Sequence, residues 1–158
     1  MTRSILALLL ALTFHAFAAP ISPETHALVM LIADREGVPR SVANWLQIEE
    51  SGDYQTGRWG DAGAVNRSEP GGWLSVGLYQ IYTKPDNLSF LLNHFWYGRG
   101  EYEPLDLKNP IHSAKIGLRY LAYLHKKFGT WYAANVSYNG AGAYSYVRAR
   151  RICQAGEP

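Results

Sequence analysis

The sequence predicts a mainly α-helical fold in a single domain. Three observations lead to this prediction: apolar residues recur at helical spacing in several stretches, helix start and stop signals bracket those stretches, and no internal repeat divides the chain. Of the 158 residues, 47% are hydrophobic and 13% are aromatic, which is a globular composition. About 140 residues remain after the N-terminal segment described next, which is the size of one domain with one core.

The N-terminal segment differs from the rest of the chain. Arg3 precedes an apolar run over residues 5–12, and small residues follow over residues 16–19. This order is typical of a secretory signal peptide. The apolar run is shorter than the roughly 20 residues that span a membrane, and an uncleaved anchor is the alternative. We therefore expect residues 1–18 to be a signal peptide and residues 19–158 to form an exported domain.

Two helices and an irregular segment are expected next. Residues 22–24 combine a capping serine, a proline at the first helical position and an acid in the first turn, and Gly37 provides a stop. A second short helix should cover residues 40–50. Residues 53–76 are rich in Gly, Asp, Asn and Ser and have no clear period, which predicts a long loop or short irregular strands. A loop of this length in a compact domain is usually functional or mobile.

The second half of the chain is expected to be helical. Leucine and phenylalanine side chains at helical spacing predict a helix over residues 88–98. The clearest helix covers residues 110–129, where Asn-Pro begins the helix, Gly129 ends it and two lysines favour its carboxyl end. Further helices are expected over residues 130–138 and from Ala143 onwards.

Charge and composition exclude several classes of protein. The formal charge is only +2, which is too small for a nucleic-acid partner. The main basic cluster is Arg148, Arg150 and Arg151. A solvated face of the C-terminal helix explains this cluster at least as well as a nucleic-acid surface does. The histidines are scattered and no cluster has zinc-like spacing, so we expect no metal and no cofactor. Cys153 is the only cysteine, which rules out a disulfide within the chain.

Three short segments of the chain need to be considered together. They are QIEESG over residues 47–52, SVGLYQI over residues 75–81 and SYNGAG over residues 137–142. In this order, and with the helical stretch 109–129 between the second and third, they resemble the lytic transglycosylase family. The resemblance spans roughly residues 28–144. It implies a lysozyme-like single domain in which the long irregular or short-strand loop follows the catalytic helix.

The resemblance also implies roles for individual residues. Glu50 matches the family's catalytic acid, and the substrate-binding positions are Ser51, Ser75, Gly77, Gln80, Tyr138 and Asn139. The implied reaction cleaves the MurNAc-GlcNAc β-1,4 bond of peptidoglycan without water and leaves 1,6-anhydro-MurNAc ends. One glutamate then acts first as acid and afterwards as base.

The implied partners are peptidoglycan glycan strands, and we expect a monomer that acts in the periplasm or cell envelope. The biological setting stays open between an envelope-spanning secretion or conjugation apparatus, a phage, and remodelling of the cell's own wall.

The residues alone do not separate Glu50 from its neighbour Glu49. Helical periodicity places both beside apolar residues, and only the Glu-Ser pairing selects Glu50. The chemistry requires a carboxylic acid that keeps its proton near neutral pH. Apolar surroundings achieve this because they disfavour the ionised form and raise the pKa. We expect such surroundings where the predicted helix 40–50 ends.

Two other functions remain open at this point. A goose-type lysozyme-like hydrolase would use a second carboxylate to help water attack, and Asp53 and Asp61 are the candidates for it in the irregular segment. A non-catalytic peptidoglycan-binding or assembly protein would keep the fold without turnover, but such a protein has no need of a partly buried acid. Some aromatic side chains could either stack on sugar rings or pack in the core. They are Trp59, Trp73, Tyr79 and Tyr82.

Overall fold

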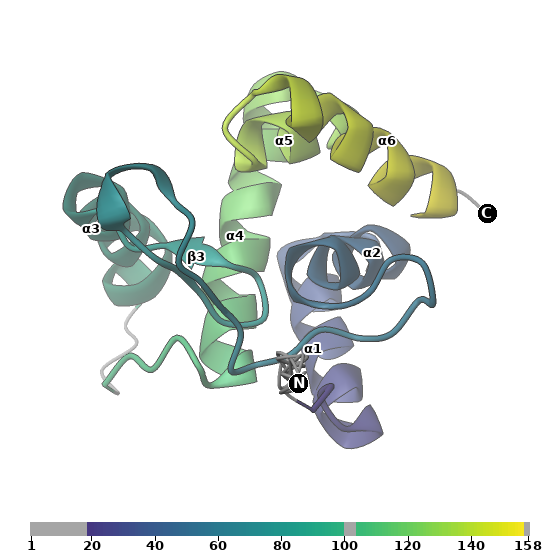
Figure 1. Cartoon of the computed structure of the whole chain (residues 1–158), viewed down its shortest axis with the longest axis horizontal. Coiled ribbons are helices and arrows are strands. Elements are labelled where there is room, and N and C mark those ends of the chain that lie inside the picture. The colour runs from purple at the N-terminus through teal and green to yellow at the C-terminus, as the bar shows by residue number, and fades with distance from the viewer. Residues whose placement is uncertain (1–18, 100–103, 157–158) are drawn as a thin grey trace, which may run out of the picture.

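The computed structural model describes residues 19–99 and 104–156, so the expected signal peptide, residues 1–18, lies outside the described residues. The described chain is mainly α-helical, which confirms the predicted fold class (Figure 1). Its α-helices are α1 (Pro23–Glu36), α2 (Arg40–Ser51), α3 (Pro85–Leu91), α4 (Pro110–Phe128), α5 (Trp131–Tyr138) and α6 (Ala143–Gly156). Within this part of the chain, no helix combines the length and the apolar character needed to cross a membrane.

Most predicted helix ends are confirmed where a capping residue marks them. The Ser22 side chain accepts a hydrogen bond from the Thr25 amide at 3.2 Å, and Gly37 ends α1 in the left-handed region at φ 71°. The Asn109 side chain accepts from the Ile111 amide at 2.9 Å at the start of α4. Local side chains thus satisfy backbone groups that a helix end leaves without partners.

The helix predicted over residues 88–98 differs in detail. The structure has α3 over Pro85–Leu91, followed by a π-helical turn, η2 (Leu92–Trp96), and a 3₁₀ turn, η3 (Tyr97–Arg99). The adjacent residues Phe95 and Trp96 are both buried. The π turn thus contributes both of these large side chains to the core.

The irregular segment contributes short strands to a small antiparallel sheet. Of the two predicted alternatives, a long loop or short strands, the second is therefore confirmed. Its strands are β1 (Val65–Asn66), β2 (Ser75–Val76) and β3 (Ile81–Tyr82), in the order β1-β2-β3, and the 3₁₀ turn η1 (Pro70–Gly72) joins the first two strands. Val76 pairs with both Val65 and Ile81. The remainder of residues 53–76 is turns and loops.

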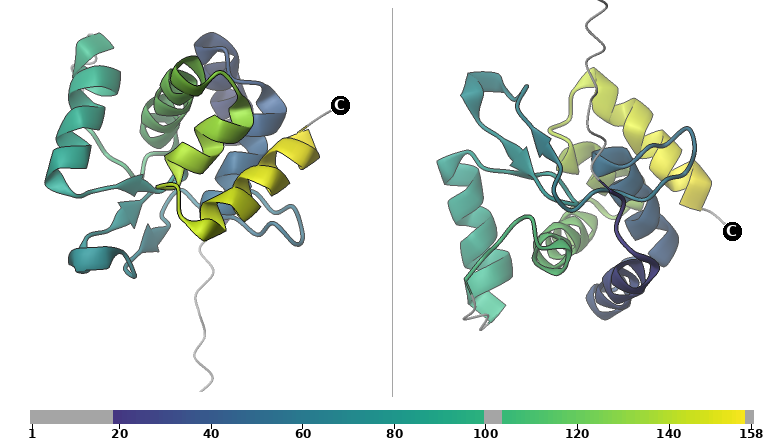
Figure 2. Two further views of the ribbon diagram at one scale, coloured as in Figure 1. Left: turned by 90° about the horizontal axis from the view of Figure 1, so that it is seen from above. Right: turned by 60° about the horizontal axis from the view of Figure 1, so that its bottom comes forward.

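Helix α4 is the central element of the core. It packs against α1 and α5, and α6 packs against both α2 and α5 (Figure 1). Four residues of α4 are completely buried: Ala114, Ile116, Leu118 and Leu121. Figure 2 shows the sheet and α3 on one side of α4, with α2 and α6 beside each other on the other side.

Gly77 joins β2 to the following turn in a conformation that only glycine adopts easily. Its φ is +84°, and a Cβ atom added there would overlap the backbone carbonyl oxygen of Leu107. The Gly77 amide also donates to the Ala64 carbonyl oxygen at 2.8 Å. Gly77 therefore lets the sheet approach the loop that leads into α4.

We predict that Gly77→Ala lowers the free energy of unfolding by at least about 2 kcal/mol, because backbone strain and overlap with a backbone oxygen add together. Gly57→Ala is the matched control, since Gly57 has φ +70° but no atom within 4 Å of an added Cβ. The control should cost only about 1 kcal/mol. Equal losses for the two variants in urea denaturation would contradict a packing role for Gly77.

Candidate active site

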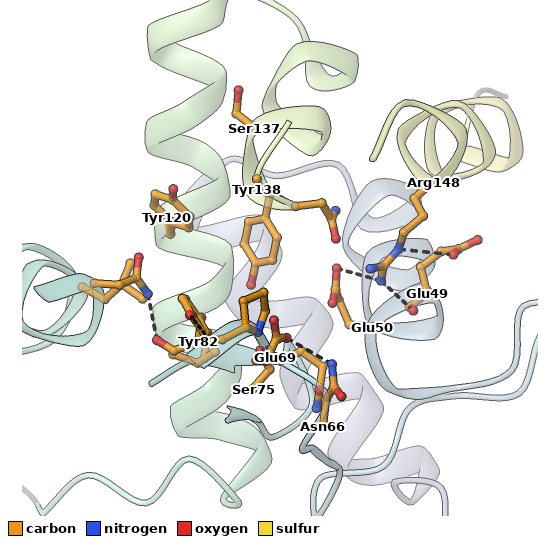
Figure 3. A pocket seen from close by; sticks show the side chains of 17 residues that line it. Glu49, Glu50, Asn66, Glu69, Ser75, Tyr82, Tyr120, Ser137, Tyr138 and Arg148 are labelled. Carbon is orange, nitrogen blue, oxygen red and sulfur yellow. Dashed lines mark hydrogen bonds and ion pairs between the residues drawn. The ribbon is translucent and has the colours of Figure 1, made fainter. Parts of the chain in front are cut away.

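A groove of about 650 Å³ lies between the end of α2, the sheet and the α5–α6 segment (Figure 3). Among the residues with predicted roles, those that line it are Glu50, Ser75, Gln80, Tyr138 and Asn139. Glu49 and Tyr82, whose roles the sequence left open, also line it, and further lining residues without a predicted role include Asn66, Glu69, Tyr120 and Arg148. Segments far apart in the sequence thus meet at one surface.

Glu50 lies at the carboxyl end of α2 and points into the groove with only 7% of its side chain exposed. Burial raises the pKa of its carboxyl group from 4.5 to about 7. Arg148 Nη2 lies 2.9 Å from Glu50 Oε1, and this ion pair lowers the pKa but is outweighed by burial. Glu50 therefore exchanges a proton near neutral pH.

Glu49 is tied to α6 instead. Its carboxylate oxygens lie 2.6 Å from Arg151 Nε and 3.6 Å from Arg148 Nε, and 3% of its side chain is exposed. The Glu49 backbone carbonyl oxygen also accepts from Arg148 Nη2 at 2.7 Å. The expectation that a solvated helix face explains these arginines is wrong for Arg148 and Arg151, because both face the end of α2.

Tyr138 lies at the end of α5, beside Glu50 (Figure 3). Asn139 is the capping residue that follows it and lines the same groove. The Tyr138 hydroxyl donates to the Tyr79 carbonyl oxygen at 2.8 Å. Burial, and next the negative charge of Glu50, raise the pKa of Tyr138 well above its ordinary value, so the phenol stays protonated. The Asn139 side chain donates to the Asn135 carbonyl oxygen at 3.1 Å.

Ser75 and Gln80 enter the groove from the sheet. Ser75 Oγ donates to Glu69 Oε1 at 2.6 Å. Gln80 has a positive φ of 46°, and its side-chain amide donates to the Gly77 carbonyl oxygen at 2.9 Å. The bond to Gly77 holds the Gln80 side chain over the turn that joins β2 to β3.

The structure does not bring Ser51 or Gly77 to the groove surface. Ser51 Oγ donates to the Leu78 carbonyl oxygen at 2.7 Å, so this hydroxyl joins α2 to the turn after β2. Gly77 packs against Leu107, as described above. Both residues support the groove from behind, and neither residue is among those that line it.

Several other candidates from the sequence lie elsewhere. Asp53 accepts hydrogen bonds within its own turn, from the Gln55 amide and the Thr56 hydroxyl, both at 3.0 Å, and Asp61 accepts from Gly63. Neither aspartate lines the groove.

Among the aromatic candidates, Trp59 stacks on His26 and Tyr79 is fully buried, so neither offers a face to sugar in the groove, whereas Tyr82 lines it. Within residues 19–99 and 104–156, no three His, Cys, Asp or Glu side chains come together in a way that would hold a metal ion.

The described chain is a helical domain whose buried Glu50 carboxyl group lies at the end of α2 and faces a groove walled by a small sheet, as expected of a lysozyme-like domain. Residues 32–152 match the family model described as the transglycosylase SLT domain, and the chain belongs to this family. No curated protein and no solved structure matches the chain significantly. Membership supports a lytic-transglycosylase type of activity on peptidoglycan.

We predict that the Glu50 carboxyl group titrates with a midpoint of about 7, followed by NMR of its side-chain carbon. Arg148→Gln removes a cation that favours the carboxylate, so the midpoint should rise, on the order of one pH unit. Arg148→Lys should largely restore it.

The matched control is Arg150→Gln on the same helix, because Arg150 is exposed and should leave the midpoint unchanged. A midpoint that falls in Arg148→Gln would contradict the assigned direction of the Arg148 effect.

Proposed function

We propose that the chain is a peptidoglycan lytic transglycosylase that cleaves the MurNAc-GlcNAc β-1,4 bond without water and leaves 1,6-anhydro-MurNAc ends. The observation that supports this most strongly is Glu50, a buried carboxyl group with a pKa of about 7 in the wall of a groove. Such a group is protonated often enough to act as an acid and ionised often enough to act as a base near neutral pH.

The reaction begins with the protonated Glu50. Its proton passes to the glycosidic oxygen as the bond from that oxygen to C1 of MurNAc breaks, so the leaving GlcNAc keeps a neutral hydroxyl. Positive charge then develops at C1 and the ring oxygen. The Glu50 carboxylate removes the proton from the MurNAc 6-hydroxyl, and that oxygen forms the new bond to C1. Glu50 ends protonated again, and no water is consumed.

Arg148 fits this cycle as a positioning residue. Its guanidinium group contacts the Glu50 carboxyl group and the Glu49 backbone, so it holds the end of α2 in place. During the reaction Glu50 becomes transiently ionised, and the adjacent cation stabilises that form. Tyr138 supports the site from the other side, with its hydroxyl fixed on the Tyr79 carbonyl oxygen.

The setting proposed for this activity is the periplasm or cell envelope, on the basis of the signal-peptide pattern in residues 1–18. Peptidoglycan strands are the substrate, and we propose a monomer with Glu50 as its acid and base. An envelope-spanning secretion or conjugation apparatus is one proposed partner, and a phage or remodelling of the cell's own wall are the alternative settings.

We predict that Glu50→Gln abolishes cleavage of purified murein while leaving the melting temperature nearly unchanged, because an amide cannot donate the required proton. Glu49→Gln should behave in the opposite way. It leaves Arg151 without its ionic partner and should destabilise the fold, on the order of 2 kcal/mol, yet retain most activity below the melting temperature. If Glu49→Gln is folded but inactive and Glu50→Gln is active, the catalytic assignment is wrong.

We predict that the cleaved strands end in 1,6-anhydro-MurNAc, which mass spectrometry distinguishes from a hydrolysis product because it is lighter by one water. Asp53→Asn and Asp61→Asn should keep substantial activity, since both residues lie outside the groove. Reducing ends on the products would instead support the goose-type hydrolase alternative. An unaltered, folded protein that binds murein without cleaving it would support the non-catalytic one.

A further inference from the structure

Glu69 is an acidic residue of the groove to which the proposed mechanism gives no role. It precedes η1 on the sheet side, whereas Glu50 enters from the end of α2, and both line the same groove (Figure 3). The sequence offered no reason to single it out, because it lies in the irregular segment between the matched motifs.

The Glu69 carboxylate is held at one oxygen. Oε1 accepts from Ser75 Oγ at 2.6 Å and from Asn66 Nδ2 at 3.0 Å. Oε2 accepts no hydrogen bond from the described residues, and none of their cations pairs with this carboxylate. Ser75 is itself buried, with 4% exposed, so the β2 strand gives Glu69 a firm anchor. One oxygen is therefore fixed by the sheet and the negative charge is left uncompensated beside the groove.

We propose that Glu69 is a second catalytic carboxylate, whose negative charge stabilises the positive charge that develops on the sugar in the transition state. The proposal rests on the proposed function, since it assigns Glu69 a part in the same glycan cleavage. Glu69 forms no covalent bond and transfers no proton. The bond changes and the proton transfers remain those of Glu50 and the MurNAc 6-hydroxyl.

The environments of the two acids suit these different roles. Glu50 is enclosed and keeps its proton near neutral pH, as an acid must. Glu69 is half-buried and is held by two neutral donors, as a charge-stabilising group should be. A fixed charge aimed at a site where opposite charge develops needs little rearrangement during the reaction. Such groups typically contribute a factor of about 10² to 10³ in rate.

The decisive comparison separates the charge of Glu69 from its shape. In Glu69→Gln, the amide oxygen can take the place of Oε1 and keep both hydrogen bonds, so only the charge is lost. Glu69→Asp keeps the charge but shortens the side chain and weakens those bonds. A catalytic charge predicts that Glu69→Asp is the more active variant, whereas a purely structural role predicts the reverse order.

The experiment uses the full chain and purified murein, with total cleaved bonds measured by chromatography and mass spectrometry. Glu69→Gln should lower kcat about 100-fold, with KM within about threefold and an unchanged melting temperature. Glu69→Asp should retain about ten times the kcat of Glu69→Gln. Asp61→Asn removes a charge from the same segment outside the groove and serves as the control.

A kcat of Glu69→Gln within about threefold of the unaltered protein would overturn the proposal, and so would a Glu69→Gln variant more active than Glu69→Asp. The failure of the proposed function looks different. Reducing ends from the unaltered protein would reject the transglycosylase reaction, but the ratio of kcat values, scored on total cleavage, would still test Glu69.

Discussion

Two adjacent carboxyl groups are buried where α2 ends, and the structure depends on how their charge is offset. Burying an ionised carboxylate without a partner costs several kcal/mol. The partners, Arg148 and Arg151, come from α6, about a hundred residues later in the chain, and Arg148 also donates to the Glu49 backbone. The pairing fastens α6 against α2. It therefore both stabilises the domain and builds one wall of the groove.

The turn after β2 is the second point on which the groove depends. Leu78 accepts from Ser51 on α2, and Tyr79 accepts from Tyr138 on α5, both through backbone carbonyl oxygens. The Tyr79 amide in turn donates to Ser113 Oγ on α4 at 3.0 Å. The three sequence motifs are thus bonded to one another at this turn. Several of their residues act by fixing the geometry around Glu50, without reaching the groove themselves.

The sequence predicted the helices well because their signals are local. A capping serine, a proline at the first position and a terminal glycine act within a few residues, and these ends were confirmed at α1 and α4. The position of Arg148 depends on contacts with the end of α2, about a hundred residues earlier, for which no local signal exists. Glu69 is held by near neighbours, but its place in the groove depends on how the sheet, α2 and α5 come together. Asp53 and Asp61 illustrate the same limit, since each satisfies its own turn and lies away from the groove.

The cation beside Glu50 bears on how one group can act as both acid and base. If Arg148 dominated, Glu50 would remain ionised at neutral pH and could not donate a proton. If burial acted alone, the carboxylate formed after donation would have no compensating charge. The two effects oppose each other, with burial the larger, and the pKa lies at about 7. At that value the protonated and ionised forms of Glu50 have similar free energies at neutral pH, so both forms are populated. In the proposed mechanism, the ion pair that fastens α6 to α2 would therefore also help a single glutamate to serve both proton transfers.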